Sequence, residues 1–316
     1  MKDDLFKVAV VGAGNVGSTF AFSLMIKGIA REIALIDVNR EKAEGECMDL
    51  NHGASFVSPV NIYAAGFEGC ANADVVVLTA GAKQRLGETR IDLVRRNVGI
   101  FKDMIPRIVE YTDEAILLVV ANPVDVLTYV TLKLSGLPSN QVLGSGTVLD
   151  SSRFRYLLSD HSKVDARNVH AYIIGEHGDS ELPVWSHANI GGILLRDYCR
   201  KRETGCDYEK ELDDIFRKVK NAAYEIIDAK GATYYAIALA LVRIVEAVLR
   251  DENSVLPVST LISDYYGVDD VCLSIPSIVN RGGVKEFLRM DLSDKEQKQF
   301  RDSAGKLRKI INELDL

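Results

Sequence analysis

The stretch Lys7–Gly17 reads KVAVVGAGNVG and decides the fold. A short Val-rich run ends at Gly12, which opens a GxGxxG pattern with Gly14 and Gly17, and a segment with helical spacing of apolar residues follows at Asn15–Lys27. Glycines at these positions allow a tight turn after a strand, bring the backbone close to a pyrophosphate and let the helix pack on the strand. The pattern therefore predicts a strand–turn–helix unit that binds a dinucleotide.

An acidic residue follows the second predicted strand at the distance that such a site requires. The segment Glu32–Val38 reads EIALIDV, and Asp37 falls 20 residues after Gly17. A carboxylate at the end of that strand accepts hydrogen bonds from the adenosine ribose hydroxyls and repels a 2′-phosphate. The sequence thus predicts NAD rather than NADP as the cofactor. Val16 and Lys42 belong to the same predicted site, although a solvated helix lysine explains Lys42 equally well.

The first half of the chain alternates short apolar runs with amphipathic segments. Further runs that predict strands lie at Asn61–Ala65, Asp74–Ala80, Ala115–Ala121 and Gln141–Leu143. Near-continuous runs of Val, Ile and Leu separated by helices are typical of a parallel sheet that is covered on both faces. Together with the first two strands, these runs predict an α/β fold with a doubly wound parallel Rossmann sheet.

The second half has a different pattern. Helices are predicted at Tyr208–Ala229, Thr233–Asp251 and Ser293–Leu314, and strands at Asn168–Ile174, Val255–Tyr266 and Val271–Val279. We therefore predict an NAD-binding Rossmann domain over residues 1–146 and a mixed α+β substrate domain over residues 147–316. Because no linker rich in Pro, Gly or Ser separates the two halves, a small-molecule site is expected in a cleft at a tight junction.

Composition and charge argue against several classes of protein. The chain has 316 residues, of which 47% are hydrophobic, and a net charge of −7, which argues against broad binding of nucleic acid. Its longest unbroken apolar run, Tyr234–Val242, is about half as long as a bilayer span, so no membrane protein is expected. The five cysteines form no CxxC pair and no secretory signal is evident, which predicts free thiols and a cytoplasmic protein.

Two polar motifs in the second half have the residue types that proton transfer on a keto acid needs. Asp150 and Arg153 are three residues apart on a predicted helix and share a face, and an arginine fork can hold a carboxylate through two hydrogen bonds. His177 lies in GEHGDS after an apolar run, where a carboxylate partner would raise the pKa of the imidazole and fix its tautomer. A surface ion pair and a structural histidine are the alternatives. No HExxH or comparable spacing occurs, so no metal site is predicted.

The segment Gly81–Arg90 reads GAKQRLGETR and is polar, with glycines at positions 81 and 87. It follows a predicted strand at the carboxyl edge of the parallel sheet, where ligands bind in folds of this type. Such a segment is typical of a lid that closes over a site and excludes water, and a solvated surface loop is the alternative.

Taken together, these motifs resemble those of the lactate/malate dehydrogenase family in its bacterial form. The resemblance rests on Asp37 and on six segments in the family's order: GAGNVG, AGAKQRLGETR, VVANPVDVLTY, SGTVLDSSRFR, IIGEHGDSELPVWS and KGATYYAIA. It extends from about Lys7 to near the C-terminus. It implies reversible hydride transfer between NADH and a 2-keto acid, and a homo-oligomer, in this family a tetramer.

By this resemblance, His177 is the catalytic acid–base and Asp150 is the carboxylate that orients it. Arg153 binds the substrate carboxylate, and Arg90 in the lid polarises the reacting carbonyl. Asn122 contacts both the nicotinamide end of the cofactor and the substrate. The other positions that the resemblance assigns line the cofactor groove, at Gly81, Ala82, Val120, Ala121 and Ser145, or the substrate pocket, at Thr233.

One lid position separates the lactate and malate branches of the family. Malate enzymes carry an arginine six residues before the polarising arginine, where this chain has Gln84. A neutral side chain would leave the second carboxylate of a dicarboxylate unpaired in a closed site, which is costly. The resemblance therefore implies reduction of pyruvate to L-lactate, with a malate or broad 2-hydroxyacid dehydrogenase as the alternative. A non-catalytic NAD-binding protein is a further alternative, but it would have lost one of the assigned residues. Leu86 stands where the family commonly has proline.

A second anion site is suggested by the arginine that follows Arg153 by two residues. Arg155 points about 200° away from Arg153 around a helix, so the two side chains face nearly opposite sides. In bacterial members of the family, the residues that match Arg155 and His170 bind fructose 1,6-bisphosphate at a subunit interface. The resemblance implies such an activator site here, and a surface arginine with a strand-end histidine is the alternative.

Overall fold

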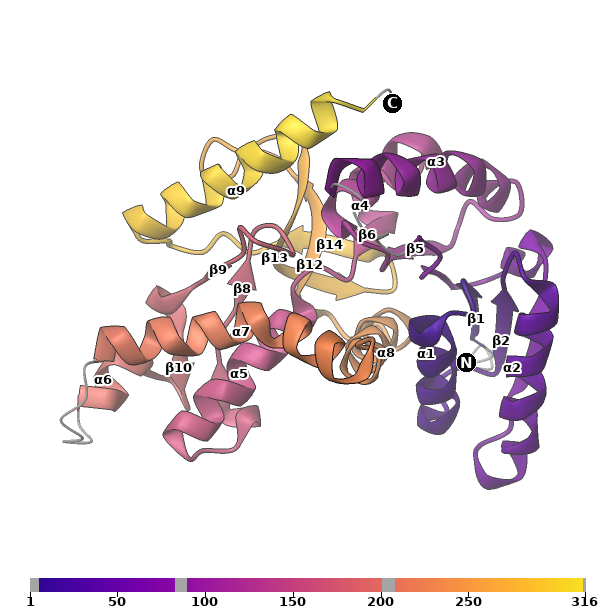
Figure 1. The fold of residues 1–316 in the computed structure, drawn as a ribbon, viewed down its shortest axis with the longest axis horizontal. Coiled ribbons are helices and arrows are strands. Elements are labelled where there is room, and N and C mark those ends of the chain that lie inside the picture. The colour runs from indigo at the N-terminus through magenta and orange to yellow at the C-terminus, as the bar shows by residue number, and fades with distance from the viewer. Residues whose placement is uncertain (1–5, 83–89, 201–207, 315–316) are drawn as a thin grey trace.

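Among residues 6–82, 90–200 and 208–314, which this computed structural model describes, nine strands form one central sheet. Their order is β14-β13-β12-β6-β5-β4-β1-β2-β3 (Figure 1). The parallel part consists of β1 (Lys7–Val11), β2 (Glu32–Ile36), β3 (Asn61–Ala65), β4 (Val75–Leu78), β5 (Ile116–Val119) and β6 (Val142–Gly144). The order 3-2-1-4-5-6 is that of the doubly wound dinucleotide-binding fold, which confirms the predicted fold class.

The parallel strands are apolar along their whole length because helices cover both faces of the sheet. In β1, Val8 and Val10 belong to one hydrophobic cluster, whereas Ala9 and Val11 belong to the other. The first cluster lies under α1 (Asn15–Lys27), α2 (Arg40–His52) and α8 (Tyr235–Leu249). The second lies under α3 (Arg90–Val109), α4 (Val124–Ser135) and α9 (Asp294–Asn312).

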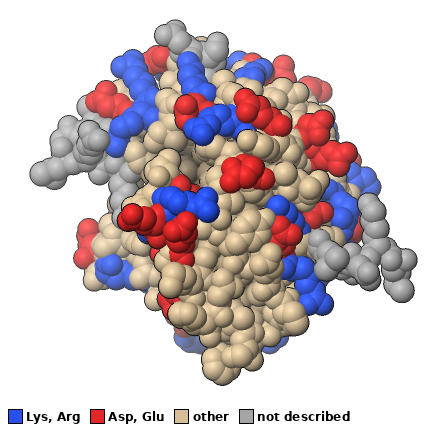
Figure 2. All heavy atoms as spheres, turned by 90° about the vertical axis from the view of Figure 1, so that its right-hand side faces the viewer, with Lys and Arg blue, Asp and Glu red and all other residues tan. Residues whose placement is uncertain are grey.

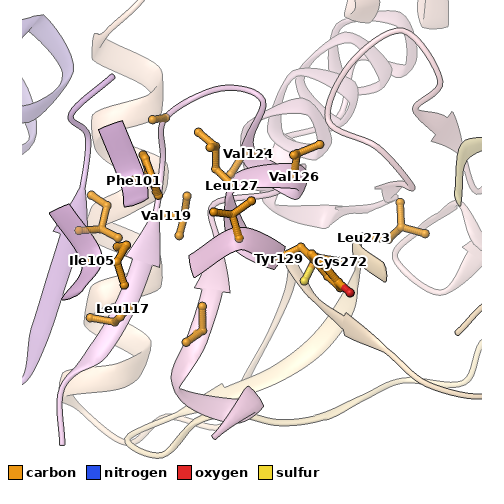
Figure 3. Packing of buried hydrophobic residues seen from close by; sticks show 14 of the residues in the cluster. Phe101, Ile105, Leu117, Val119, Val124, Val126, Leu127, Tyr129, Cys272 and Leu273 are labelled. Atoms are coloured by element: carbon orange, nitrogen blue, oxygen red, sulfur yellow. The ribbon is translucent and has the colours of Figure 1, made fainter. Parts of the chain in front are cut away.

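Helix α4 lies deep in the second cluster and connects the two halves of the chain. In the view of Figure 3, Phe101 of α3 lies close to Val119 of β5. Val124 and Leu127 of α4 separate this pair from Cys272 of β13 (Val271–Asn280). Residues Val124 to Thr131 of this helix are all buried. Polar groups on α4 are therefore held by protein atoms rather than by bulk water.

The second half extends the same sheet with antiparallel strands. Strand β12 (Ser254–Ile262) pairs with β6 through Ser259 and Gly144, and β13 and β14 (Gly283–Phe287) follow. The predicted boundary at residue 147 stays a prediction, because one sheet runs across it. Helices α5 (Val148–Ser162), α6 (Leu195–Arg200) and α7 (Tyr208–Lys230) belong to this half. Within the described ranges, no helix is both long and apolar enough to cross a membrane.

The single strand predicted at Asn168–Ile174 is wrong. The chain forms two short strands there, β7 (Val169–His170) and β8 (Ile173–Ile174), which belong to different sheets. Strand β7 pairs with β10 (Asn189–Ile190), which also pairs with β11 (Ile193–Leu194), and β8 pairs with β9 (Leu182–Pro183). The strand is interrupted because side chains of α5 form hydrogen bonds with backbone groups of this segment. Arg155 Nε donates to the Ala171 carbonyl at 2.9 Å, and Ser151 Oγ accepts from the Ile173 amide at 2.9 Å.

Candidate active site

The residues assigned to the cofactor groove meet at one edge of the sheet. They follow the carboxyl ends of the parallel strands: Gly12 after β1, Gly81 and Ala82 after β4, Val120, Ala121 and Asn122 after β5, and Ser145 after β6. A Cβ atom placed on Gly81 would lie 3.0 Å from the Cβ of Ala121, so the turns after β4 and β5 are in close contact. Ligands bind outside the carboxyl ends of parallel strands in this fold, and the groove therefore lies where a dinucleotide is expected.

The glycine loop has the backbone geometry that a pyrophosphate requires. Gly12 has a φ of +109°, and a Cβ atom on Gly17 would lie 1.9 Å from the Gly12 carbonyl oxygen, whereas no atom lies within 4 Å of a Cβ atom on Gly14. Helix α1 begins after Gly14 without a side-chain cap and without an acidic residue in its first turn. Its amide groups and the positive end of its dipole therefore face an open position, which fits the pyrophosphate of NAD.

Asp37 lies just after β2 and is fixed against this loop. Its Oδ2 atom accepts a hydrogen bond from the Ala13 amide at 2.6 Å, and its Oδ1 atom accepts one from the Asn39 amide at 2.8 Å. Each carboxylate oxygen has a second lone pair, which leaves room for a ribose hydroxyl. Val16 lies half-buried on α1, and Lys42 lies exposed in the first turn of α2.

The structure brings His177 and Asp150 together although they lie 27 residues apart. His177 follows β8, and Asp150 is a buried residue in the first turn of α5. Nδ1 of His177 lies 2.5 Å from Oδ2 of Asp150, and Oδ1 of Asp150 accepts a hydrogen bond from Arg153 NH1 at 2.8 Å. The carboxylate therefore orients the imidazole through one oxygen and holds the guanidinium through the other.

The electrostatics of this pair favour the protonated imidazole. Burial alone would lower the pKa of His177, but the Asp150 carboxylate outweighs this effect and raises the pKa to about 9. Burial would likewise raise the pKa of Asp150, but His177 and Arg153 outweigh it and lower that pKa. A ring that keeps its proton at neutral pH can act as a general acid toward a carbonyl oxygen.

Two buried carboxylates that act on the imidazole, besides Asp150, were missed in the sequence. Asp125 in α4 is 1% exposed, and Glu181 after the His177 loop is 8% exposed. Burial raises the pKa of Glu181 to about 8, and the Asp150 carboxylate adds to this effect. An acid inside the apolar segments PVDVLTYV and ELPVW was the available signal, since buried acids are rare unless they have a specific role.

Asp150, His177 and Glu181 each offer an atom within 4.8 Å of the others, a spacing that a metal ion could use. Two of these three groups already have strong partners, because Asp150 is bonded to both Arg153 and the imidazole. The contacts therefore support a site for a proton between the groups.

A buried asparagine, also missed in the sequence, links two loops of the cofactor edge. Asn97 of α3 is 1% exposed. Its Oδ1 atom accepts from the Ala82 amide at 2.7 Å, and its Nδ2 group donates to the Asn122 carbonyl at 2.7 Å. It thus fixes the first residues after β4 against the loop after β5. The signal was an amide side chain on the apolar face of a helix.

Several assigned positions lie away from these contacts. Gln84 and Leu86 lie outside the described residues, as does the side chain of Arg90, although Arg90 begins α3. Thr233 is half-buried in the connection between α7 and α8, and its place in the substrate pocket stays a prediction.

The two residues of the predicted activator site lie on adjacent elements, Arg155 on α5 and His170 on β7. Arg155 bonds the carbonyl of Ala171, the residue after the exposed His170, and its guanidinium lies 5.0 Å from the ring centre of Tyr172. Burial lowers the pKa of this arginine. As the helical spacing predicts, Arg153 and Arg155 contact different parts of the molecule, Asp150 and the β7–β8 connection respectively.

A Rossmann sheet with a glycine-lined cofactor edge, and a histidine paired with a buried carboxylate, is the arrangement of an NAD-dependent dehydrogenase. Residues 6–144 match the family model described as lactate/malate dehydrogenase, NAD binding domain, and residues 147–315 match lactate/malate dehydrogenase, alpha/beta C-terminal domain. The chain belongs to the lactate/malate dehydrogenase family, and its cofactor is NAD.

Similar proteins cover nearly the whole chain. The L-lactate dehydrogenase of Acetivibrio thermocellus is 58% identical over 310 residues, which are 98% of each chain. The L-lactate dehydrogenase of Thermoanaerobacter pseudethanolicus is 53% identical over 98% of this chain and 99% of its own. The crystal structure of the minor L-lactate dehydrogenase from Enterococcus mundtii in a ligand-bound form superposes with a TM-score of 0.96 at 42% identity, covering 99% of this chain and 100% of that one.

Proposed function

We propose that this protein is an NAD-dependent L-lactate dehydrogenase, which interconverts pyruvate and NADH with L-lactate and NAD⁺. The observation that carries the proposal is the cluster of His177, Asp150 and Arg153, because it joins a proton donor to a cation that suits a carboxylate. The neutral Gln84 supports a substrate with one carboxylate rather than two. The relatives that carry the name L-lactate dehydrogenase support the same substrate.

In the proposed mechanism, each side chain has one task. Arg153 binds the substrate carboxylate with the N–H groups that Asp150 leaves free. His177 donates its proton from Nε2 to the carbonyl oxygen, because Nδ1 is held by Asp150. NADH, when bound, supplies the hydride for the keto carbon. Asn122 and Thr233 position the substrate, and Arg90 polarises the carbonyl once the lid with Gln84 has excluded water.

Substrate preference tests this proposal directly. We expect a kcat/KM with NADH that is at least about 100-fold higher for pyruvate than for oxaloacetate, since a neutral lid residue leaves the second carboxylate unpaired. Gln84→Arg should reverse the order. A higher kcat/KM for oxaloacetate in the unmodified enzyme would show a malate dehydrogenase instead, and His177→Asn with full turnover would overturn the assigned chemistry.

We further propose that fructose 1,6-bisphosphate activates the enzyme at Arg155 and His170. The exposed imidazole of His170, and a half-buried arginine that bonds to the carbonyl of the next residue, support a site for a phosphate group. Pyruvate saturation curves with and without the bisphosphate test this, and we expect a lower KM in its presence. The double variant Arg155→Gln, His170→Gln should lose the response but keep its basal kcat. Identical curves for the unmodified enzyme with and without bisphosphate would contradict the proposal.

We also propose a homo-oligomer, in this family a tetramer, that works in the cytoplasm. Large apolar side chains are exposed on α1, α2 and α8, namely Phe22 and Ile26, Met48, and Leu239. Figure 2 shows a broad area with few charged side chains in the lower half of the α2 side, which suits a contact with a second copy. Analytical ultracentrifugation tests the assembly, and a monomer at micromolar concentration would contradict it. Cell fractionation tests the location.

A further inference from the structure

Helix α4 carries a buried acid in its first turn, Asp125, within an otherwise apolar segment. Its Oδ1 atom accepts hydrogen bonds from Ser259 Oγ of β12 at 2.7 Å and from Ser274 Oγ of β13 at 3.5 Å. Its Oδ2 atom accepts from the backbone amide of His177 at 2.7 Å. One carboxylate thus connects the nucleotide-binding half, the antiparallel strands and the catalytic loop.

The amide of His177 is the last of three consecutive amides held by three different elements. The Gly175 amide donates to the Ser274 carbonyl at 2.9 Å, and the Glu176 amide donates to Ser303 Oγ at 2.8 Å. Gly175 has a φ of +89°, a conformation that favours glycine, and a Cβ atom there would lie 2.9 Å from the side chains of Leu182 and Ser303. Among the three acceptors, only Asp125 carries a charge, and it holds the residue that carries the imidazole.

The charges around the imidazole come from three directions. Asp150 faces it from α5, Asp125 from α4 and Glu181 from the end of its own loop. Arg153 and Lys220 lie near Glu181, and Arg153 also pairs with Asp150, so both of these acids have cations beside them. The hydrogen-bond donors of Asp125 are neutral, and the neighbouring charges that act on it are those of His177 and Glu176. Its negative charge therefore acts on the imidazole with little compensation.

We propose that Asp125 is a positioning residue for the reaction, which holds the backbone of His177 in place and favours its protonated ring through a negative charge on α4. The inference rests on the proposed role of His177 as acid–base. It connects the histidine to the nucleotide site, because Asp125 lies three residues after Asn122, the residue assigned to the nicotinamide end.

The variant Asp125→Asn separates charge from shape. The amide oxygen can still accept from the His177 amide, and the amide nitrogen can donate to Ser259 Oγ, which also accepts hydrogen bonds. We expect the alkaline limb of kcat/KM for pyruvate to move to lower pH by about half a unit or more, because a negative charge near the imidazole is lost. The Kd for NADH and the melting temperature at neutral pH should not fall. Asp125→Ala also removes the acceptor for the amide, so its kcat should fall by about tenfold or more.

Glu296→Gln is the matched control. Glu296 is also a buried carboxylate, 4% exposed, but it caps α9 and accepts from Ser186. Its loss should leave the pH profile unchanged. The proposal is wrong if Asp125→Asn keeps the pH profile of the unmodified enzyme, or if both variants shift it equally. His177→Asn tells the two claims apart: an inactive His177→Asn with an unshifted Asp125→Asn refutes the role of Asp125 alone, whereas an active His177→Asn refutes the proposed function itself. Should Asp125→Ala fail to fold, Asp125→Asn still decides.

Discussion

The substitution Asp150→Asn tests the central contact of the proposed site. In the structure the Asp150 carboxylate accepts at 2.5 Å from Nδ1 of His177, and its other oxygen accepts from Arg153. An asparagine keeps the shape and an oxygen for Arg153, but it turns an N–H group toward Nδ1. The variant therefore replaces a charged acceptor by a neutral donor at the imidazole, which favours the unprotonated ring.

The size of the effect follows from the pKa of His177. Asp150 is the main reason that this pKa rises from the ordinary 6.5 to about 9, which corresponds to about 3 kcal/mol in favour of the protonated ring. Without the carboxylate, burial remains and the pKa falls to its ordinary value or below. At about pH 8 a ring with a pKa of about 9 is about 90% protonated, and one with a pKa of about 6.5 is about 3% protonated. Loss of the proton alone then costs about 30-fold in kcat/KM, and the lost stabilisation of the charged ring adds to this.

The assay is the pH dependence of kcat/KM for pyruvate with NADH held at saturation. We expect kcat/KM for the unmodified enzyme to stay level up to about pH 8 and to fall above it, as Glu181 and then His177 lose their protons. For Asp150→Asn, the fall should begin near neutral pH or below. Arg153→Lys is the control, since it leaves the imidazole paired; its KM for pyruvate should rise by about 100-fold with the alkaline limb unchanged. An alkaline limb that stays in place in Asp150→Asn, with less than about threefold loss at pH 8, would refute the reasoning.

Three further outcomes are expected. Gly17→Ala should weaken NADH binding by at least about tenfold and lower the melting temperature, because a Cβ atom there lies 1.9 Å from the Gly12 carbonyl oxygen. Gly14→Ala should fold normally, since no atom lies within 4 Å of a Cβ atom at that position. Fluorescence titration with NADH and thermal melts test this pair, and equal results for the two variants would contradict it. Ionisation of Glu181 should raise the KM for pyruvate above about pH 8, and Glu181→Gln should remove this contribution to the rise. A dependence of KM on pH that is identical in the variant and the unmodified enzyme would show that the carboxyl does not face the substrate. Burial raises the pKa of Asp125 from the ordinary 3.8 to about 6, so this carboxyl stabilises the fold below about pH 3.8 and loses that contribution, about 3 kcal/mol, as the pH rises through about 6. The melting temperature of Asp125→Asn minus that of the unmodified protein should then be larger at about pH 7.5 than at about pH 4.5. An equal difference at the two pH values would refute the raised pKa of Asp125.

Local patterns in the sequence predict the nucleotide edge well because that edge is built from consecutive residues. The turn at Gly12, the start of α1 and the acid Asp37 at the end of β2 all follow from spacing within a few tens of residues. The same holds for Asp150 and Arg153, whose ion pair is an i,i+3 contact on one helix. Where a contact is made within one supersecondary unit, periodicity and motif suffice to predict it.

Contacts between distant segments were predicted less well. The spacing of residues did not show that Asp125 holds the amide of His177, because this bond joins α4 to a loop 52 residues away. The apolar alternation in Asn168–Ile174 predicted one strand, but Arg155 and Ser151 of α5 bond to the backbone there and divide it. Side chains that reach across the fold to backbone groups leave no periodic signal, so tertiary contacts override the local pattern.

The charges of the site explain how it can hold three carboxylates and still bind an anion. At neutral pH Asp150 and Asp125 carry negative charges, since the pKa of Asp150 is lowered and that of Asp125 is about 6, and His177 and Arg153 carry positive ones. Glu181 keeps its proton until about pH 8. The charges of these five groups then sum to zero, and a bound keto acid adds one negative charge to them. Above about pH 8 the ionised Glu181 adds a negative charge to this cluster, and this charge should repel the carboxylate of pyruvate. We therefore expect Glu181 to set the alkaline limit of substrate binding and Asp150 to set that of proton transfer, and the two limits can be separated as effects on KM and on kcat.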